Sequence, residues 1–386
     1  MTRVSRPGDL TADLRRVTGV RRTRGHTVDV TTLAELERRL GEGVRHLSGW
    51  RVRHVDLRQR PGLLRGHDVE GATFLGCDFA DDEARGAEEG GAVVLPRLSE
   101  PTVPVDVRRD SLYTARELFD APRWTDSLDG RAYAWSKPGA VDGAEVSAEV
   151  PLARTLHDHA IDLALDAWRA DRRVVGVMGG HAAQRGDPTY ADAARLGHLL
   201  GAGLTVATGG GPGAMEAANL GARLAAHPAA AVEQSVAELS RVPSYRPSVD
   251  AWAASAFAVC DRFDEPRESL AIPTWHYGHE PPGVFATAIA KYFRNATREA
   301  ILLEVCDAGI VFLPGAAGTV QEVFQDACEN YYADAGDVAP MVLVGVEHWT
   351  RTLPAWPLLQ ALAAERAMAD SVHLVDTVEE AAALLG

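Results

Sequence analysis

Two glycine-rich stretches follow apolar runs and lead into helical sequence, a composition typical of anion-binding loops. The first is GGGPGAM at 209–215, after LTVAT, and the second is PGAAGTVQE at 314–322, after GIVFL. A helix that starts at such a loop presents unpaired backbone N–H groups and the positive end of its dipole. A third loop, GGHAAQRGDPTY at 179–190, also follows an apolar run. Any one such loop is more often a tight turn than a binding site, but together the loops predict a site for a small anion.

The second stretch also carries a carboxylate. Thr319 and Glu322 have the spacing of a capping box, in which the glutamate only returns a hydrogen bond to the start of its helix. The local pattern favours this capping role, and the alternative is a carboxylate held beside a bound anion. Upstream, RNATRE supplies Arg294 and Arg298 on a helix that leads into the next apolar run. Arg298 lies nearer to the end of that helix, so it is the better candidate for the site.

The glycine spacing disfavours the common nucleotide and cofactor sites. Gly209, Gly211 and Gly213 form GxGxG instead of GxGxxG, and no acidic residue follows at the distance that a dinucleotide ribose requires. The chain has no GxxxxGK[ST] motif, and neither of its two lysines, Lys137 and Lys291, lies in a loop after a strand, as a pyridoxal enzyme would need. We therefore expect no bound cofactor.

Composition limits the partners. The chain has 386 residues and a net charge of −15, which argues against a nucleic-acid-binding surface. Its four cysteines are widely spaced, no apolar run is long enough to span a membrane, and no signal peptide is recognisable. The stretch HYGHE at 276–280 resembles a metal site but lacks a third placed ligand, so we expect a polar loop and no metal. A cytoplasmic protein is expected.

The segments that position these loops have the sequence pattern of an α/β fold. From about residue 151, short apolar runs alternate with helical segments, which predicts a Rossmann-like, doubly wound parallel sheet with helices on both faces. One predicted helix covers FATAIAKYFRNATREAILLEV, residues 285–305. Because ligands of such sheets lie beyond the carboxyl ends of the strands, the three loops should meet at one edge.

The predicted organisation has four parts. We expect a loose arm over 1–25, a smaller accessory α/β domain over 26–120, a connector over 121–150, and the Rossmann-like domain over 151–386 with a helical insertion at 227–265. Within the accessory domain, VEGATFLGCDF is similar to one turn of a pentapeptide-type β coil, but one copy does not make a repeat.

The two glycine-rich motifs resemble the signature of the LOG family, whose members are often called possible lysine decarboxylases and include cytokinin-activating phosphoribohydrolases. The stretches GGHAAQRGDPTY, TGGGPGAMEAANLGA and EPPGVFATAIAKYFRNATRE are most similar to the long bacterial nucleotide 5′-monophosphate nucleosidases, in the same order. The likeness covers about residues 172–350. Where the family has PGG, this chain has Ala316 at the second glycine, which would strain a loop that needs positive φ there.

The resemblance implies a set of site residues. The catalytic pair falls on Arg298 and Glu322. Substrate-binding positions fall on Gly180, His181, Arg185, Gly210, Gly211, Gly213, Met215, Glu216, Glu280, Gly315, Gly318 and Thr319. The implied activity is hydrolysis of the N-glycosidic bond of a nucleoside 5′-monophosphate, in a homodimer or larger homo-oligomer. The alternative is a non-catalytic nucleotide- or cofactor-binding protein on the same fold, a carrier or a sensor.

Overall fold

The computed structural model describes residues 28–95, 103–137, 149–276 and 280–386. It divides into two compact units, Met1–Glu100 and Pro101–Gly386. The predicted arm over 1–25 lies outside the described residues, as do residues 138–148 of the predicted connector. The division at residue 100 differs from the predicted accessory domain, which extended to residue 120. Residues 103–137 belong with the second unit because several of their apolar side chains, among them Tyr113 and Leu118, are buried in its hydrophobic core.

The first unit is a short coil of parallel strands. Its strands pair in chain order, and they are β1 (Val28–Val30), β2 (Trp50–Arg53), β3 (Thr73–Leu75) and β4 (Val93–Leu95). Helices α1 (Leu33–Gly41) and α2 (Glu83–Glu89) belong to the connections. Thr32 caps α1, since its side chain accepts a hydrogen bond from the Glu35 N–H group.

This coil corrects the expectation that the region holds no repeat. Val30 pairs with Val52, and Val52 pairs with Phe74, so these equivalent positions are 22 residues apart, and Phe74 pairs with Val94 after 20 residues. The side chains of Val30, Val52 and Phe74 are fully buried and stack into one row of the core. The sequence does not reveal this repeat, because the stacked positions share only their apolar character. A coil of this kind requires apolar residues at only a few positions per turn.

The second unit is built on a seven-stranded parallel sheet with the strand order β11-β10-β9-β5-β6-β7-β8. The strands are β5 (Val174–Met178), β6 (Thr205–Thr208), β7 (Ser269–Ala271), β8 (Ala288–Ile289), β9 (Ile310–Phe312), β10 (Met341–Val344) and β11 (Val372–Val375). All residues of β5, β6 from Val206 onward, β9 and β10 are buried, as the continuous apolar runs predict. The expected Rossmann-like class is confirmed.

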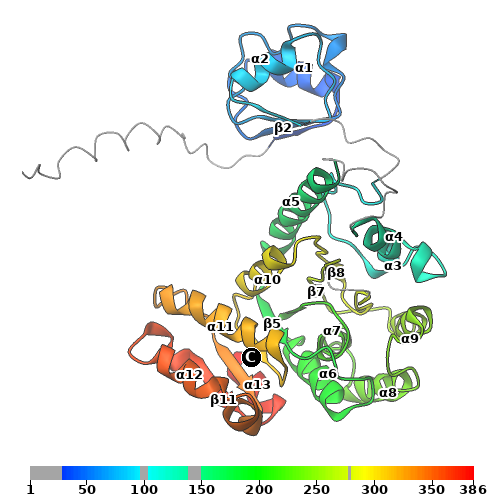
Figure 1. Ribbon diagram of the computed structural model, residues 1–386, viewed down its shortest axis with the longest axis vertical. Helices are drawn as coiled ribbons and strands as arrows, with labels where there is room; N and C mark the ends of the chain where they lie inside the picture. Colours follow the sequence, from blue (N-terminus) through cyan, green and yellow to red (C-terminus); the bar gives the residue numbers. More distant parts are fainter. Residues whose placement is uncertain (1–27, 96–102, 138–148, 277–279) are drawn as a thin grey trace, which may run out of the picture. The chain divides into compact units, whose positions relative to one another are not determined.

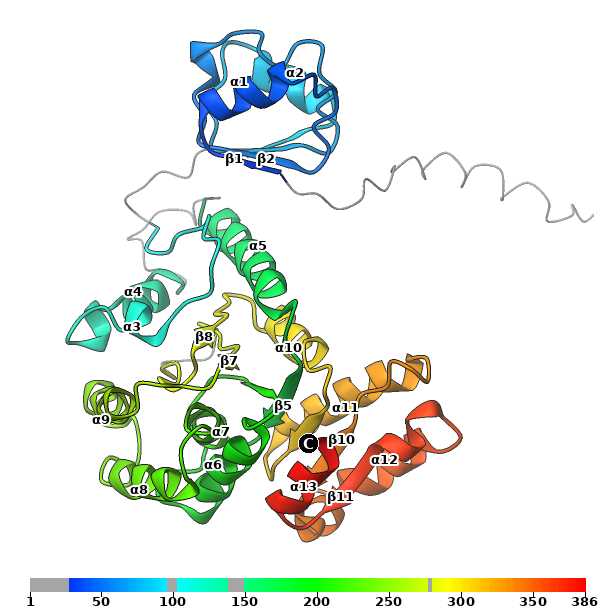
Figure 2. The same ribbon diagram turned by 180° about the vertical axis from the view of Figure 1, so that it is seen from behind.

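Helices cover both faces of this sheet (Figures 1 and 2). On one side α6 packs against α7 and α13, and on the other α11 packs against α10 and α12. The helices of this unit are α3 (Ala115–Leu118), α4 (Leu128–Trp135), α5 (Glu149–Arg169), α6 (Pro188–Leu200), α7 (Ala214–Arg223), α8 (Ala229–Leu239), α9 (Val249–Arg262), α10 (Asn295–Glu304), α11 (Ala317–Tyr332), α12 (Ala355–Ala363) and α13 (Val378–Leu385). The predicted insertion over 227–265 forms α8 and α9. Among the described residues, no helix has both the length and the apolar composition needed to cross a bilayer.

The predicted helix over 285–305 is only half correct. Its first part runs as extended chain that includes β8, and the helix α10 begins at Asn295. Leu270 of β7 pairs with Ala288, and Ala271 pairs with Ile289. Most of the side chains from 285 to 293 are buried, because this segment lies at the edge of the sheet. A helix in this place would bury only one of its faces. The spacing of apolar residues suggests a helix here, but the segment is an extended chain buried on all sides.

Residues 103–137 close this same edge. Tyr113 and Ile289 exchange both backbone hydrogen bonds, at 2.9 and 2.8 Å, in an antiparallel bridge. Nearby, the Lys291 ammonium donates to the Asp129 carboxylate at 2.6 Å, and each side chain is only 1% exposed. Lys291 is therefore a buried structural cation, consistent with the absence of a Schiff-base lysine from the predicted site.

Candidate active site

The strand order reverses next to β5, and a cavity lies at this point. The chain runs outward from β5 to β8 in one direction and then returns to β9 on the other side of β5. Crevices beyond the carboxyl ends of strands at such a switch point are where α/β sheets bind ligands. A cavity of about 720 Å³ is found here, and its lining includes residues from the loops after β5, β6 and β9, together with Arg298, Glu299, Glu322 and His348.

The three glycine-rich loops meet at this cavity. Gly180 lies between the other two loops, because a Cβ atom on it would stand 3.6 Å from the Pro314 carbonyl oxygen. On the other side, Gly213 has a φ of +77°, and a Cβ atom there would stand 2.7 Å from the Gly180 carbonyl oxygen. Only glycine fits a position that combines positive φ with such a close backbone approach. The loops therefore pack directly on one another at the edge of the sheet.

Helix α11 begins earlier than the capping-box pattern predicts. Its N-cap is Ala316 and its first residue is Ala317, so Glu322 lies in the second turn and cannot be the capping partner of Thr319. The capping interpretation is wrong, and Glu322 lines the cavity instead. The first backbone bond of the helix runs from Val320 to the Ala316 carbonyl, so the N–H groups of residues 317–319 precede it and face the helix start.

The departure from the PGG motif causes no strain. Ala316 has a φ of −112°, so this position does not need the positive φ that would favour glycine. The glycine that the loop requires is Gly315, where a Cβ atom would stand 2.1 Å from the Thr319 hydroxyl oxygen. Thr319 thus fills the space that Gly315 leaves empty, and both residues line the cavity together with Gly318.

Glu322 has the electrostatic environment of a reactive carboxylate. Burial raises the pKa of its carboxyl group to about 7, the positive charge of Arg298 opposes this rise, and the negative charge of Glu299 adds to it. A carboxylate with a pKa near neutrality can exchange protons efficiently at physiological pH. Such a group in a cavity, perturbed by burial and by charged neighbours, has the properties expected of a functional site.

Arg298 is held at the start of α10 by polar contacts. Its Nη2 donates to the Asn295 Oδ1 atom at 3.1 Å, and its side chain is 9% exposed. The entry to the helix is fixed by Asp158 of α5, whose carboxylate accepts the N–H groups of Phe293 at 2.9 Å and Arg294 at 3.0 Å. By contrast, Arg294, the other candidate arginine, is exposed. The structure thus brings Arg298 and Glu322 to one cavity from two neighbouring helices.

Arg185 and Glu216 were both predicted to bind substrate, but they bind each other. The Arg185 Nε lies 3.1 Å from the Glu216 Oε1 atom, and each side chain is 1% exposed. Arg185 also donates to Ser255 Oγ at 2.8 Å, and its guanidinium lies over the Trp252 ring. Arg185 lines neither cavity at this edge. It belongs to the loop after β5 and ties that loop to α7 and α9.

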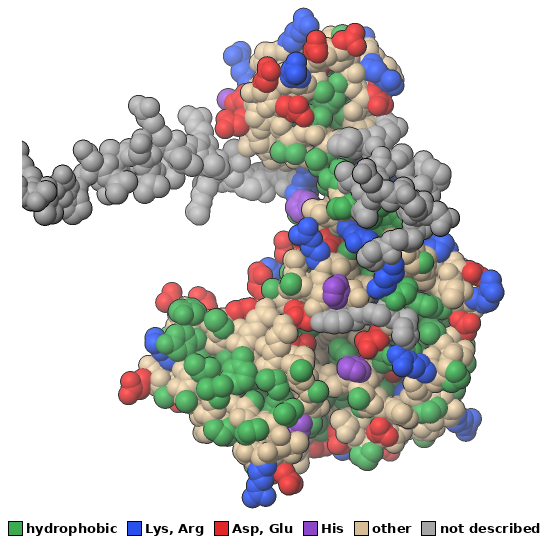
Figure 3. Space-filling view, viewed as in Figure 1, with side chains coloured by type: hydrophobic (Ala, Val, Ile, Leu, Met, Phe, Trp, Pro, Cys, Tyr) green, Lys and Arg blue, Asp and Glu red, His purple; other side chains and the backbone are tan. Residues whose placement is uncertain are grey.

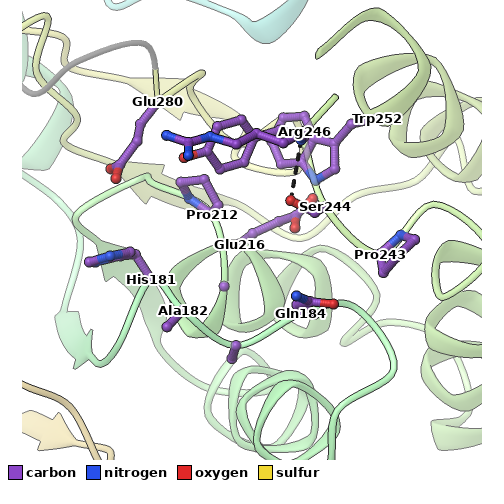
Figure 4. Close-up of a pocket in the computed structure, with 13 residues that line it drawn as sticks. His181, Ala182, Gln184, Pro212, Glu216, Pro243, Ser244, Arg246, Trp252 and Glu280 are labelled. Atoms are coloured by element: carbon purple, nitrogen blue, oxygen red, sulfur yellow. Dashed lines mark hydrogen bonds between the residues drawn. The ribbon is translucent and has the colours of Figure 1, made fainter. Parts of the chain in front are cut away.

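A second, smaller cavity of about 290 Å³ adjoins the first and shares His181 and Glu280 with it. Glu216 and Gly213 line this second cavity, not the first. Figure 4 shows Arg246 extending toward Glu280, with His181 on the facing loop. The remaining wall includes Gln184, Ser244, Tyr245 and Trp252.

The other predicted positions divide between lining and support. Gly180, His181, Gly211, Met215, Glu280, Gly315, Gly318 and Thr319 line the larger cavity. Gly210 lines neither, since its φ of +68° shapes the turn and a Cβ atom there would stand 2.8 Å from the Ala271 Cβ atom. Of the possible metal ligands in HYGHE, residues 277–279 lie outside the described residues. No group of three or more possible metal ligands occurs in the part of the chain that the structure describes.

Sequence reasoning missed three lining residues that carry an acidic or basic side chain, namely Glu299, His348 and Arg246. Glu299 follows Arg298 directly and was not singled out, although its charge beside Arg298 is visible in the sequence. His348 comes from the π-helical turn at His348–Thr352, and its Nε2 lies 3.1 Å from the Gly315 carbonyl oxygen. Arg246 comes from the loop between α8 and α9. Neither His348 nor Arg246 belongs to a motif, so no local signal marks them.

Comparison with known proteins adds little to this geometry. No family model and no curated protein matches the sequence. Among solved structures, the molybdenum cofactor binding protein from Rippkaea orientalis is 18% identical and matches with a TM-score of 0.34, over 55% of this chain and 94% of its own. The molybdenum cofactor carrier protein from Chlamydomonas reinhardtii is 17% identical, with a TM-score of 0.35, over 55% of this chain and 95% of its own.

Proposed function

We propose that this protein hydrolyses the N-glycosidic bond of a nucleoside 5′-monophosphate, releasing the free base and ribose 5-phosphate. The observation that carries the proposal is the position of Glu322, which is partly buried in the cavity beside Arg298 and not engaged in capping its helix. The activity is the one that the resemblance of the two glycine-rich motifs implies.

The start of α11 suits a phosphate group. Gly315, Gly318 and Thr319 lie where backbone N–H groups and a hydroxyl converge at a helix N-terminus, a ready site for an anion. Arg298 adds a fixed cation on the adjacent wall. Binding the phosphate at this end would hold the ribose at a set distance from Glu322, so that binding energy remote from the reaction fixes the reacting carbon.

The chemistry needs one carboxylate and one water molecule. As the bond between the anomeric carbon and the base nitrogen breaks, the base leaves with the electron pair and positive charge develops on the ribose ring, as in glycoside hydrolysis. The Glu322 carboxylate stabilises this charge and takes a proton from the attacking water. The water supplies the hydroxyl group of ribose 5-phosphate, and one proton is returned to the base, so no further reactant is consumed.

The second cavity supplies room for the base. It adjoins the first at His181 and Glu280, and it contains hydrogen-bonding side chains of both kinds, since Glu280 accepts while Arg246 and Gln184 donate. The ion pair of Arg185 with Glu216 neutralises the carboxylate at the floor of this cavity. We propose that the base enters here while the phosphate stays at α11.

The direct test is incubation with AMP, GMP, CMP, UMP and IMP, with free base measured by chromatography. Base release by the wild-type chain, reduced about 100- to 1,000-fold in Glu322→Gln, is the expected result. No release from any of the five nucleotides would refute the hydrolase. If the same protein then bound a nucleotide tightly without turnover, the carrier or sensor alternative would take its place.

We further propose that the protein acts in the cytoplasm as a homodimer or larger homo-oligomer. The large exposed apolar side chains include Tyr332 of α11 and Leu358 and Leu362 of α12, and hydrophobic side chains gather over these helices in Figure 3. A patch of this kind is typical of a protein contact. Light scattering of the purified chain tests this, and a monomeric mass at micromolar concentration would rule it out.

A further inference from the structure

Glu299 is a second carboxylate close to the two proposed catalytic side chains. It follows Arg298 in α10 and lines the same cavity as Arg298 and Glu322. Its side chain is only 12% exposed. A carboxylate so close to Glu322 would be unfavourable for a site that only binds an anion, because both charges repel a phosphate. Glu299 therefore needs a structural or functional explanation other than binding the anion.

The contacts of Glu299 reach both helices. Its Oε1 atom accepts a hydrogen bond from Asn295 Nδ2 at 2.8 Å and lies 3.6 Å from the Arg298 Nη2 atom. Its Oε2 atom accepts a hydrogen bond from Gln321 Nε2 at 2.7 Å. Gln321 belongs to α11 and directly precedes Glu322. One carboxylate thus contacts the residue that carries the guanidinium and the neighbour of the residue that carries the reactive carboxylate.

We infer that Glu299 is a positioning residue that ties α10 to α11 and sets the Arg298 guanidinium relative to Glu322. This inference rests on the proposed function, in which those two groups act together. The Nη2 atom of the planar guanidinium lies near both the Glu299 carboxylate and the Asn295 amide oxygen, and these two contacts restrict its rotation away from the cavity. Preorganisation of this kind lowers the entropy lost when the phosphate binds.

The same arrangement affects proton affinity at Glu322. The charged or titratable groups that face Glu322 or share its cavity are Arg298 and Glu299 from α10, His348 from the turn after β10, and His181 and Glu280 from the other loops. Asp326 follows one turn later on α11. Of these, Arg298 lowers the pKa of Glu322 and Glu299 raises it. Replacing Glu299 by a neutral amide therefore lowers the pKa of Glu322.

The experiment separates the charge of Glu299 from its contacts. Glu299→Gln keeps the shape and removes the charge, whereas Glu299→Ala removes both. Glu304→Gln is the matched control, because Glu304 is an exposed glutamate at the end of the same helix. Two readouts that need no turnover are used on the full chain. They are the titration of the Glu322 carboxyl by NMR of ¹³C-labelled glutamate, assigned through Glu322→Gln, and the affinity for ribose 5-phosphate by calorimetry.

We expect the titration midpoint of the Glu322 carboxyl group to be about half to one pH unit lower in both Glu299 variants, because each variant removes one nearby like charge. Ribose 5-phosphate affinity should fall about ten-fold in Glu299→Ala and less in Glu299→Gln. An unchanged midpoint in Glu299→Gln, or wild-type affinity in Glu299→Ala, would overturn the inference. If Glu299→Ala does not fold, the isosteric variant still decides it.

These outcomes are distinguishable from failure of the proposed function. A shifted midpoint and weakened binding in a protein that releases no base would leave the positioning role intact and refute only the hydrolase. The opposite result is also possible to recognise. If the wild-type chain releases base but both Glu299 variants match the Glu304→Gln control in Glu322 titration midpoint and in ribose 5-phosphate affinity, the hydrolase stands and the positioning role is refuted.

Discussion

Arg185 of the loop after β5 and Glu216 of α7 form an ion pair in which each side chain is 1% exposed. A buried pair of this kind depends on both partners, because removal of one leaves the other charged and desolvated. Glu216→Ala should therefore destabilise the fold by about 3–5 kcal/mol, measured as the free energy of unfolding in urea.

A matched exposed pair gives the comparison. Arg195 lies near Asp192 and Glu379, with side chains about half exposed, so Arg195→Ala should cost no more than about 1 kcal/mol. Equal, small losses in both variants would show that Glu216 is not needed to compensate Arg185.

Glu322→Gln should be more stable than the wild type at high pH, and the difference should shrink as the pH falls. The pKa of Glu322 rises from its ordinary value of 4.5 to about 7 in the fold. The folded state therefore holds more protons than the unfolded state between these values, and the wild type loses stability as the pH rises from about 4.5 to about 7. The amide has no such loss. Thermal unfolding at pH 5 and pH 8 checks this, and a Tm difference independent of pH would contradict it.

The pH dependence of base release should follow the same group. If Glu322 acts as a carboxylate, kcat/KM rises with pH and levels off above its pKa of about 7. The profile for the best nucleotide between pH 5 and pH 9 measures this. A rate that falls through pH 7 would assign Glu322 the role of a proton donor instead.

Gly315→Ala should weaken phosphate binding, because the added methyl group meets the Thr319 hydroxyl, 2.1 Å from the position of the new Cβ atom. We expect the KM for the nucleotide to rise about ten-fold or more. Thr319→Gly in the same chain should restore part of the loss, because it removes the hydroxyl, Cβ and Cγ2 atoms that lie 2.1, 2.6 and 3.1 Å from the new Cβ atom. Gly336→Ala is the control, as nothing lies within 4 Å of its Cβ position. If the double variant binds no better than Gly315→Ala, the clash is not the cause.

Arg246→Gln should separate the two ends of the substrate. Arg246 lines the smaller cavity but not the larger one. The KM for the nucleotide should rise several-fold, whereas inhibition by ribose 5-phosphate, which has no base, should not change. Equal weakening of both would place Arg246 on the phosphate side and contradict the proposed orientation.

The sequence by itself determined the class of fold and the loops. Apolar strands that alternate with helices are local patterns, and a parallel sheet brings the ends of its strands to one edge. The loops at 179–190, 209–215 and 314–322 were therefore predictable as neighbours. The site residues Arg298 and Glu322 came from the resemblance of the motifs, since the local pattern favoured a cap for Glu322.

Tertiary structure decided what each side chain does. Arg185 turned away from the cavity because Glu216, 31 residues later, and Trp252 of α9 surround it. The segment before α10 is extended because it lies buried at the edge of the sheet, where β8 pairs with β7. The coil of the first unit is recognisable only from the pairing of its strands. Glu299 became a bridge only because α11 brings Gln321 within hydrogen-bond distance. Short-range patterns fix backbone elements, whereas charge compensation and burial depend on partners distant in the chain, which no local pattern encodes.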